Sequence, residues 1–411
     1  MNRRHFISHL TATASISSAA ASFTDSILAN SAEMRKRTNS VIMLWMGGGP
    51  STIDLWDLKP GSPTGGAFKP ISTTADGIQI CEHLPLMAKQ MHHLNIVRSM
   101  STREADHNRG RYYMHTGYVP NPNIEHPSYG SVVSHEILNS ELEVPSFVSV
   151  GGPSVGPGFL GAAYAPFVVD SNGNIRDLNS GIDPNRMADR LSILESIENN
   201  FIVNRQGLAS EHKKIINKTV KLMTSRQMEA FKVSKEPENV KDRYGNTSFG
   251  KGCLMARRLV EIGIPFIEVD LGGWDNHSNI FTTLQNQKLP ELDKAMSALV
   301  SELSDRGLLE TTAIIWMGEF GRTPNINGNA GRDHWARSWS VVVGGAGFKK
   351  GLVVGETNSD GKEVITDPYS SQDLMASVLK SVGISLETTF TSKNGRPMKI
   401  ANSGKVIKEL F

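Results

Sequence analysis

Residues 40–46, with the sequence SVIMLWM, decide the fold of this chain. They form an unbroken apolar run that ends at residues 47–50 (GGGP), and such a run is typical of a strand buried on both faces of a parallel sheet. Residues 312–317 (TAIIWM) have the same character and follow a segment in which apolar residues recur at helical spacing, from Leu292 to Leu303. We therefore predict two buried strands, the second of which is preceded by a helix.

The same alternation of helix and strand continues elsewhere. Residues 250–263 predict a helix before a strand at 265–271, and a strand at 339–344 comes before a late helix at 372–382. These segments predict a doubly wound α/β fold with a mostly parallel central sheet and helices on both faces. Residues 184–245 are different, because they indicate two or three consecutive helices with a lysine-rich face, and we interpret them as a helical insertion within one domain that spans residues 33–411.

Composition excludes several classes of protein. The 411 residues include 43 lysines and arginines against 41 aspartates and glutamates, and 39% of the residues are apolar. This is ordinary globular composition, which excludes a disordered tail, a collagen-like fibre and a multispanning membrane protein. The near-neutral balance predicts no nucleic-acid partner, because binding to a phosphate backbone depends on an excess of basic residues.

The first 32 residues are typical of a targeting segment. Arg3 and Arg4 precede a weakly apolar stretch rich in alanine, serine and threonine, and residues 19–21 (AAA) offer a cleavage site. This segment resembles a twin-arginine export signal, which implies contact with the twin-arginine export machinery and a periplasmic or cell-surface location. The alternative is a surface arginine pair before a disordered arm. No other apolar run approaches the roughly 18 residues that span a bilayer, so we predict no transmembrane span.

Polar side chains that can bind a metal fall just after the predicted strands. They are Asp275 and His277 in GGWDNH, Glu319 in MGEFGRTP and His334 in GRDHW. Because the carboxyl ends of strands in an open α/β sheet meet at one crevice, we expect these groups to form a site for Zn²⁺ or Mn²⁺, with Ca²⁺ and Mg²⁺ as further candidates. The alternative is that the short motifs arise by chance and that the histidines are solvated.

Other candidate residues surround this predicted site. Ser51 follows the glycine turn and is a candidate nucleophile, and Asp54 is a candidate ligand; alternatively, the two form a helix capping box. His107 is a candidate nucleophile, acid or ligand. Arg322 is a candidate for steadying developing charge.

Three neighbours of His107 are candidates for binding an anionic substrate, Asn108, Arg109 and Arg111. The alternative for the two arginines is ion pairing with Glu104 or Asp106.

Two resemblances extend this interpretation. Residues 308–321 (LLETTAIIWMGEFG) resemble the sulfatase and alkaline phosphatase superfamily, and this resemblance implies an alkaline-phosphatase-like fold with Glu319 as a metal-binding acid. Residues 107–117 (HNRGRYYMHTG) are similar to the stretch that begins with the superfamily's nucleophile, which places His107 at the nucleophile and Arg111 at an arginine four residues later. The positions of Asp275, His277 and His334 match further ligands.

The whole chain more closely resembles an exported bacterial family called domain of unknown function 1501. The motifs that carry this resemblance are WMGGGPSTID at 45–54, MHTGYVP at 114–120, RRLVE at 257–261, GWDNH at 273–277, GEFGRTP at 318–324 and GRDHW at 331–335. The chain departs from the superfamily at three places: glycines end the first strand in place of aspartates, Phe320 follows the metal-binding acid, and His107 replaces serine, threonine or cysteine.

Together these features predict an exported, metal-dependent hydrolase of phosphate or sulfate esters that acts on a small anionic molecule or an anionic glycan. The metal would neutralise anionic oxygens and activate a water or hydroxyl. The alternative is a degenerate superfamily member that binds an anionic glycan or a partner protein at the cell surface, and the three departures favour this alternative.

Overall fold

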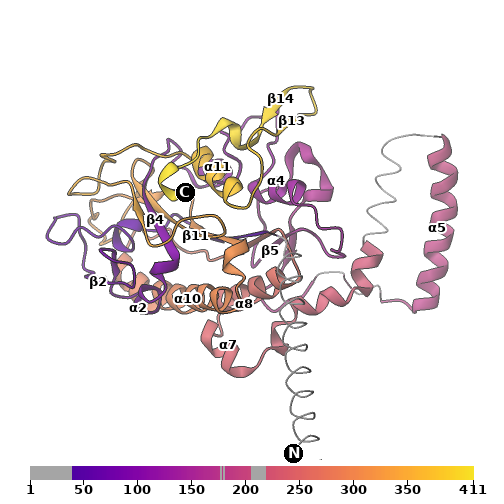
Figure 1. Cartoon of the computed structure of the whole chain (residues 1–411), viewed down its shortest axis with the longest axis horizontal. Coiled ribbons are helices and arrows are strands. Elements are labelled where there is room, and N and C mark those ends of the chain that lie inside the picture. The colour runs from indigo at the N-terminus through magenta and orange to yellow at the C-terminus, as the bar shows by residue number, and fades with distance from the viewer. Residues whose placement is uncertain (1–38, 176–177, 179–180, 205–218) are drawn as a thin grey trace, which may run out of the picture. The chain divides into compact units, whose positions relative to one another are not determined.

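A computed structural model of the chain describes residues 39–175, 178, 181–204 and 219–411, and the expected export signal at residues 1–32 lies outside them. Residues Asn39–Phe411 form one compact unit built on an eight-stranded sheet (Figure 1). In spatial order the strands are β12 (Val353–Val354), β4 (Leu94–Met100), β11 (Trp339–Gly345), β8 (Thr312–Met317), β1 (Ser40–Trp45), β7 (Phe266–Asp270), β5 (Phe147–Val150) and β6 (Phe167–Val169).

The sheet is mostly parallel, as the sequence predicts. Strand β1 pairs in parallel with both β7 and β8, so the two apolar runs that decide the fold are direct neighbours. Strand β11 is the exception, because it runs antiparallel to β8 and β4. The expected βα alternation is therefore wrong at this strand. The connection from β8 to β11 contains no helix that could carry the chain back across the sheet, so β11 starts at the edge where β8 ends and runs the opposite way.

Both faces of the sheet are covered by helices, and β1 divides its side chains between two apolar cores. Ile42 and Leu44 join the core that contains α8 and α10, whereas Val41, Met43 and Trp45 join the core on the other face. Figure 1 shows α8 and α10 below the sheet and α4 and α11 above it. This alternation along a fully buried strand explains the continuous apolar run. The principal covering helices are α3 (His107–Thr116), α4 (Tyr129–Glu136), α8 (Ser248–Glu261), α10 (Leu289–Asp305) and α11 (Ser371–Ser381).

The start of α3 is fixed by local capping. The side chain of Asp106 accepts a hydrogen bond from the backbone N–H of Arg109, and Gly117 ends the helix in the left-handed region at φ 74°. Such caps satisfy backbone groups that the helix itself leaves unpaired. They place His107 in the first turn of α3, beside the end of β8.

Residues 184–245, for which the sequence predicts a helical insertion, contain α5 (Pro184–Asn204) and α7 (Glu238–Tyr244), with residues 205–218 outside the described part of the chain. Shorter elements include α2 (Pro85–Ala88), α9 (Ile280–Thr283), and the hairpin of β2 (Pro70–Ser72) and β3 (Gln79–Cys81). Among the helices that the structure describes, none has the length and apolar character needed to cross a bilayer.

Candidate metal centre and active site

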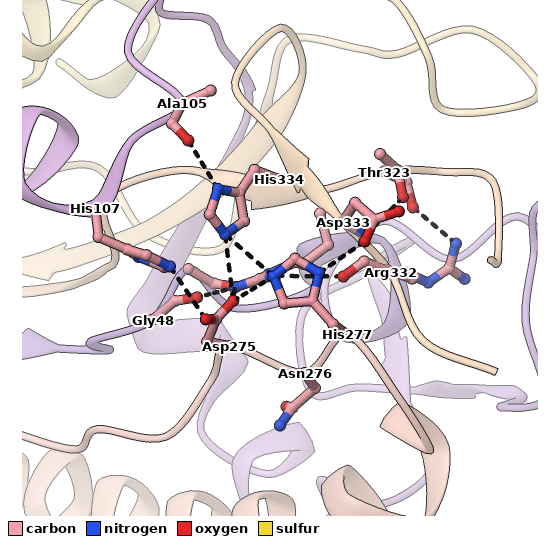
Figure 2. Close-up of polar contacts among 12 residues, drawn as sticks. Gly48, Ala105, His107, Asp275, Asn276, His277, Thr323, Arg332, Asp333 and His334 are labelled. Atoms are coloured by element: carbon pink, nitrogen blue, oxygen red, sulfur yellow. Dashed lines mark hydrogen bonds and ion pairs between the residues drawn. The ribbon is translucent and has the colours of Figure 1, made fainter. Parts of the chain in front are cut away.

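The predicted ligand residues meet at the carboxyl edge of the central strands. Asp275 and His277 lie in the loop after β7, and Glu319 and Arg322 follow β8. His334 begins the short strand β10 (His334–Trp335), which pairs with β9 (Gly321–Arg322). Figure 2 shows the side chains of Asp275, His277 and His334 pointing toward one another. The topology accounts for the meeting, because β7 and β8 flank β1 and end at the same edge.

Three potential ligand atoms form a compact triangle. Oδ1 of Asp275 lies 2.9 Å from Nε2 of His277 and 3.2 Å from Nε2 of His334. The two Nε2 atoms are 3.3 Å apart. Ligand bonds of 2.0–2.1 Å in a tetrahedral zinc site put neighbouring ligand atoms about 3.3 Å apart. The spacing of the triangle therefore fits one zinc-sized ion.

In each imidazole, the hydrogen-bond partner of Nδ1 decides which of the two nitrogens carries the proton. Nδ1 of His334 lies 2.8 Å from the backbone oxygen of Ala105, and Nδ1 of His277 lies 2.6 Å from Oδ1 of Asp333. A carbonyl and a carboxylate only accept hydrogen bonds, so both Nδ1 atoms must donate. In neutral imidazoles both Nε2 atoms then present lone pairs to each other and to the Asp275 carboxylate. A cation between them would remove this repulsion.

Asp333 is therefore expected to support the metal site although its carboxylate points to the far side of His277. We expect Asp333→Asn to weaken zinc affinity about 10- to 100-fold, because the amide no longer fixes the protonated Nδ1 as strongly or raises the basicity of Nε2. Competition with a zinc chelator measures this affinity. Asp76→Asn, at an exposed position, is the matched control, and equal affinities for both variants would contradict the assignment.

Arg322 is buried behind the triangle, and each of its five donors faces an acceptor. Its Nε donates to the carbonyl of Gly49 at 2.7 Å, and Nη2 donates to Oδ1 of Asp275 at 2.6 Å and to the carbonyl of Gly48. Nη1 faces the carbonyl of Arg332 at 3.2 Å and Nε2 of His277 at 3.4 Å. The expected role in steadying substrate charge would require one of these bonds to break.

Charge around Arg322 shifts the pKa values of its neighbours. Partial burial of Asp275 acts to raise the pKa of its carboxyl, but the hydrogen bond and charge of Arg322 outweigh it and hold the pKa at about 2. The hydrogen bond from His277 lowers the pKa of Asp333, and burial lowers the pKa of Arg322 itself. Both carboxylates are therefore ionised at neutral pH, which is the state that binds metal.

His107 lies beside the triangle with one nitrogen already engaged. Its Nδ1 is 2.7 Å from Oε1 of Glu319, which also accepts a hydrogen bond from the backbone N–H of Gly48 at 2.9 Å. Its Nε2 is 3.2 Å from Oδ2 of Asp275, although no hydrogen bond forms there. Potential ligand atoms of His107, Asp275 and His334 all lie within 4.8 Å of one another. Among the residues that the structure describes, the buried Oε2 of Glu319 also lacks a hydrogen-bond partner, so His107 and Glu319 each keep one unpaired atom that could bind a metal.

Ser51 and Asp54 are engaged with each other and with Arg332. Both residues are 1% exposed, and the Ser51 hydroxyl donates to Oδ2 of Asp54 at 2.6 Å. Asp54 forms a two-pronged ion pair with Arg332, at 2.8 Å for each N···O distance. Ser51 precedes a 3-10 helix, but its side chain makes no capping hydrogen bond there, so the expected capping box is wrong. A ligand role for Asp54 would require it to give up a buried cation.

The predicted substrate-binding residues make other contacts. Arg109 forms an ion pair with Glu104, with Nε 2.6 Å from Oε2, which is the alternative that the sequence left open. Arg111 donates from Nη2 to the carbonyl of Pro153. Asn108 is exposed in the first turn of α3. Arg109 and Arg111 therefore bind other partners. The structure does bring together six predicted site residues, namely Asp275, His277, Glu319, His334, His107 and Arg322.

Sequence reasoning missed two supporting residues, Asn327 and Ala105. Asn327 donates from Nδ2 to the carbonyl of His277 at 3.0 Å and to Oδ1 of Asp333 at 3.2 Å. The carbonyl of Ala105 orients His334, and no side-chain pattern could have revealed it. Phe320, one of the three departures from the superfamily, contacts two site residues: the centre of its ring lies 4.7 Å from that of the His334 ring and 5.1 Å from that of the His107 ring.

Comparison with solved structures finds sulfatases and phosphatases. The chain is similar to the PsFucS1 sulfatase from Pseudoalteromonas sp., at 13% identity over 86% of this chain and 70% of that one, with a TM-score of 0.40. It is similar to an alkaline phosphatase from the Antarctic bacterium TAB5, at 14% identity over 84% and 98% of the two chains, with a TM-score of 0.35. A phosphonate monoester hydrolase from Silicibacter pomeroyi shows 12% identity over 90% and 76%, with a TM-score of 0.34.

Comparison with curated protein sequences gives no match. A family model described as "Protein of unknown function (DUF1501)" matches residues 38–411, which is almost all of the chain and includes every residue of the candidate centre. The chain therefore belongs to the DUF1501 family.

Proposed function

We propose that this protein is a metal-dependent hydrolase of phosphate or sulfate esters. The observation that carries the proposal is the convergence of Asp275, His277 and His334, with both Nδ1 atoms committed to acceptors and both Nε2 atoms facing each other at 3.3 Å. Two imidazoles and a carboxylate are a ligand set that Zn²⁺ and Mn²⁺ accept, and three protein ligands leave a position for water or substrate.

In this proposal the chain's own residues divide the work. A bound divalent ion would supply positive charge for anionic ester oxygens and for a nucleophilic water. Arg322 holds the Asp275 carboxylate ionised and in place. His107 donates from Nδ1 to Glu319, so its Nε2 is free to accept a proton from the attacking water. As this proton is transferred, the water oxygen forms a bond to phosphorus or sulfur, and the bond from phosphorus or sulfur to the ester oxygen breaks.

A second candidate function has its own support. The guanidinium of Arg322 already neutralises Asp275 at 2.6 Å, and Asp54, the first acid after β1 in the sequence, is held by Arg332. A site that has lost ligands in this way suits a protein that binds an anionic glycan or a partner protein without turnover. This candidate predicts a protein that lacks activity even when it is loaded with metal.

Removing and restoring metal tests the proposed reaction. Protein purified from its native host is analysed for bound metal, and hydrolysis of 4-nitrophenyl phosphate and 4-nitrophenyl sulfate is measured before and after chelation. We expect stoichiometric metal, loss of most of the activity with the chelator, and recovery with Zn²⁺ or Mn²⁺. Activity that is indifferent to the chelator would overturn the metal-dependent mechanism, and a metal-loaded but inert protein would support the binding function.

We also propose export through the twin-arginine pathway, because Arg3 and Arg4 precede a weakly apolar stretch in the first 32 residues. Replacing both arginines by lysine should leave the protein in the cytoplasmic fraction of its host, whereas Arg35→Lys with Arg37→Lys should not. Cell fractionation followed by immunoblotting measures the distribution. Equal export of both double variants would show that the first pair is not an export signal.

A further inference from the structure

We propose that Asp270 is the general acid of the hydrolase and donates a proton to the ester oxygen as that oxygen leaves. Asp270 is the last residue of β7, and it pairs in register with Trp45, the last residue of β1. It therefore lies at the carboxyl edge of the sheet, where the loop that carries Asp275 begins. This role complements that of His107, which accepts a proton from the attacking water, and it rests on the proposed function.

The carboxyl group of Asp270 is half-buried and has no polar partner. Among the residues that the structure describes, no hydrogen bond or ion pair is found for it. A methyl group placed on Gly47 would lie 3.6 Å from Oδ1, and one placed on Gly152 or Gly272 would lie 3.7 Å from Oδ2. These glycines follow β1, β5 and β7, so no side chain from any of the three positions covers the carboxyl group. A ligand at this edge of the sheet can therefore approach it.

The peptide unit that joins Gly47 to Gly48 lies between Asp270 and the candidate centre. The carbonyl of Gly47 accepts a hydrogen bond from the N–H of Trp274 at 3.1 Å, directly before the first residue of the triangle. The N–H of Gly48 donates to Oε1 of Glu319 at 2.9 Å. Given the length of one peptide unit, Oδ1 of Asp270 lies at most about 10 Å from Oε1 of Glu319. One small ester can therefore span the two.

Helix α3 sets the spacing between the base and the acid. Arg111 comes four residues after His107, so both lie on the same face of α3, about 6 Å apart along its axis. His107 contacts Glu319, whereas the guanidinium of Arg111 lies 6.0 Å from the centre of the Trp45 ring, beside Asp270. Asp270 thus lies about one helical turn from His107. An in-line displacement needs this separation, because the attacking and leaving oxygens lie on opposite sides of phosphorus or sulfur.

The surroundings of Asp270 favour its protonated form. Burial raises the pKa of its carboxyl group, and the charge of Arg111 on α3 only partly offsets this effect. The carboxylates of Glu268 on β7 and Glu319 after β8 raise the pKa further, and His115 on α3 lowers it, with a raised pKa as the result. His115 is itself paired with Glu268 at 3.2 Å. Asp270 therefore holds a proton at pH values where an ordinary aspartate has lost it, as a general acid must.

The proton transfers balance over one turnover. The proton of the Asp270 carboxyl passes to the ester oxygen as the bond from that oxygen to phosphorus or sulfur breaks, so a neutral alcohol leaves. His107 takes one proton from the water, and the return of a proton to Asp270 through solvent restores both groups. The acid matters most for poor leaving groups. Phenol ionises only near about pH 10, as tyrosine does, whereas 4-nitrophenol ionises far more readily and leaves as an anion.

The first test compares two leaving groups in one variant. For Asp270→Asn we expect kcat/KM to fall about 100-fold or more with the phenyl ester and less than about fivefold with the 4-nitrophenyl ester. The esters are those of phosphate and of sulfate, and hydrolysis is measured on the metal-loaded full chain. A residue that only supported the fold would affect both leaving groups alike. The control is Asp76→Asn, at an exposed position, which should leave both rates unchanged.

The second test needs neither metal nor turnover. Because the pKa of Asp270 is raised in the folded protein, the stability that this group contributes is present at low pH and is lost as the pH rises through the raised pKa. Asp270→Asn lacks this loss. Its urea midpoint, relative to that of the unchanged protein, should therefore rise between about pH 4 and pH 8 after chelator treatment. The relative midpoint of Asp76→Asn should not change.

Three results would overturn this role alone. They are equal losses with both leaving groups, a relative urea midpoint for Asp270→Asn that does not change with pH, and loss of bound metal in that variant, which would make Asp270 a ligand instead. A protein that hydrolyses none of the esters, with or without metal, would overturn the proposed function and this role with it. Chelator-sensitive hydrolysis together with selective loss of the phenyl esters would support both.

Discussion

Replacing His334 by alanine is expected to abolish stoichiometric metal binding and, with it, hydrolysis of aryl esters. Nε2 of His334 is one of only three atoms in the compact triangle, at 3.2 Å from Oδ1 of Asp275 and 3.3 Å from Nε2 of His277. Structural zinc sites with four ligands bind with about 10–16 kcal/mol, so one ligand is worth roughly 2.5–4 kcal/mol, which is about 60- to 700-fold in affinity. Competition with a zinc chelator and metal analysis measure the loss.

The control for this variant is His92→Ala, which removes an exposed imidazole whose Nδ1 contacts the hydroxyl of Thr74. It should bind metal as the unchanged protein does. If His334→Ala retained metal within a few-fold of that control, the triangle would not be the metal site, and the hydrolase proposal would lose the observation on which it rests. Comparing His334→Ala with His92→Ala therefore distinguishes the loss of a metal ligand from the loss of an imidazole elsewhere on the protein.

Much of the fold could be predicted from the apolar pattern, because a strand that is buried on both faces has a continuous apolar sequence. Residues 40–45 and 312–317 form β1 and β8, which are neighbours in parallel register. The direction of β11 could not be inferred in this way. Its sequence is as apolar as that of a parallel strand, and its direction depends on a connection of 21 residues that contains no helix.

The candidate site, like the fold, could be predicted only in part. Asp275, His277 and His334 could be predicted to meet, because Asp275 and His277 follow β7 and His334 lies in the connection that follows β8, and both strands end at one edge of the sheet. The partners that orient them could not, since Ala105 contributes only a backbone carbonyl. The buried partner of Asp54 could not be predicted for a related reason. A carboxylate near a glycine turn suits a metal, and nothing local reveals an arginine 278 positions away in the sequence that neutralises it.

The ion pair between Asp54 and Arg332 leads to the largest expected effect on stability. Arg332 is fully buried, and it donates to both carboxylate oxygens of Asp54 and to the carbonyl of Thr64 at 2.9 Å. Asp54→Asn would leave the guanidinium charge of Arg332 uncompensated in the interior, which lowers the free energy of unfolding by about 3–5 kcal/mol. Denaturation by urea, monitored by tryptophan fluorescence, measures this loss. Asp76→Asn, on the surface, should change the free energy by about 0.5 kcal/mol or less.

A double variant separates the effect of this ion pair on stability from its effect on metal binding. Asp54→Leu with Arg332→Met removes both charges, so no unpaired charge stays buried and most of the lost free energy of unfolding should return. Metal affinity depends on more than that charge, because the side chain of Arg332 also binds the carbonyl of Thr323 at 3.1 Å and thereby holds the loop that leads to His334. We therefore expect the double variant to be stable and yet to bind zinc more weakly than the unchanged protein. A double variant as unstable as Asp54→Asn would show that packing around these side chains, and not the unpaired charge, accounts for the loss.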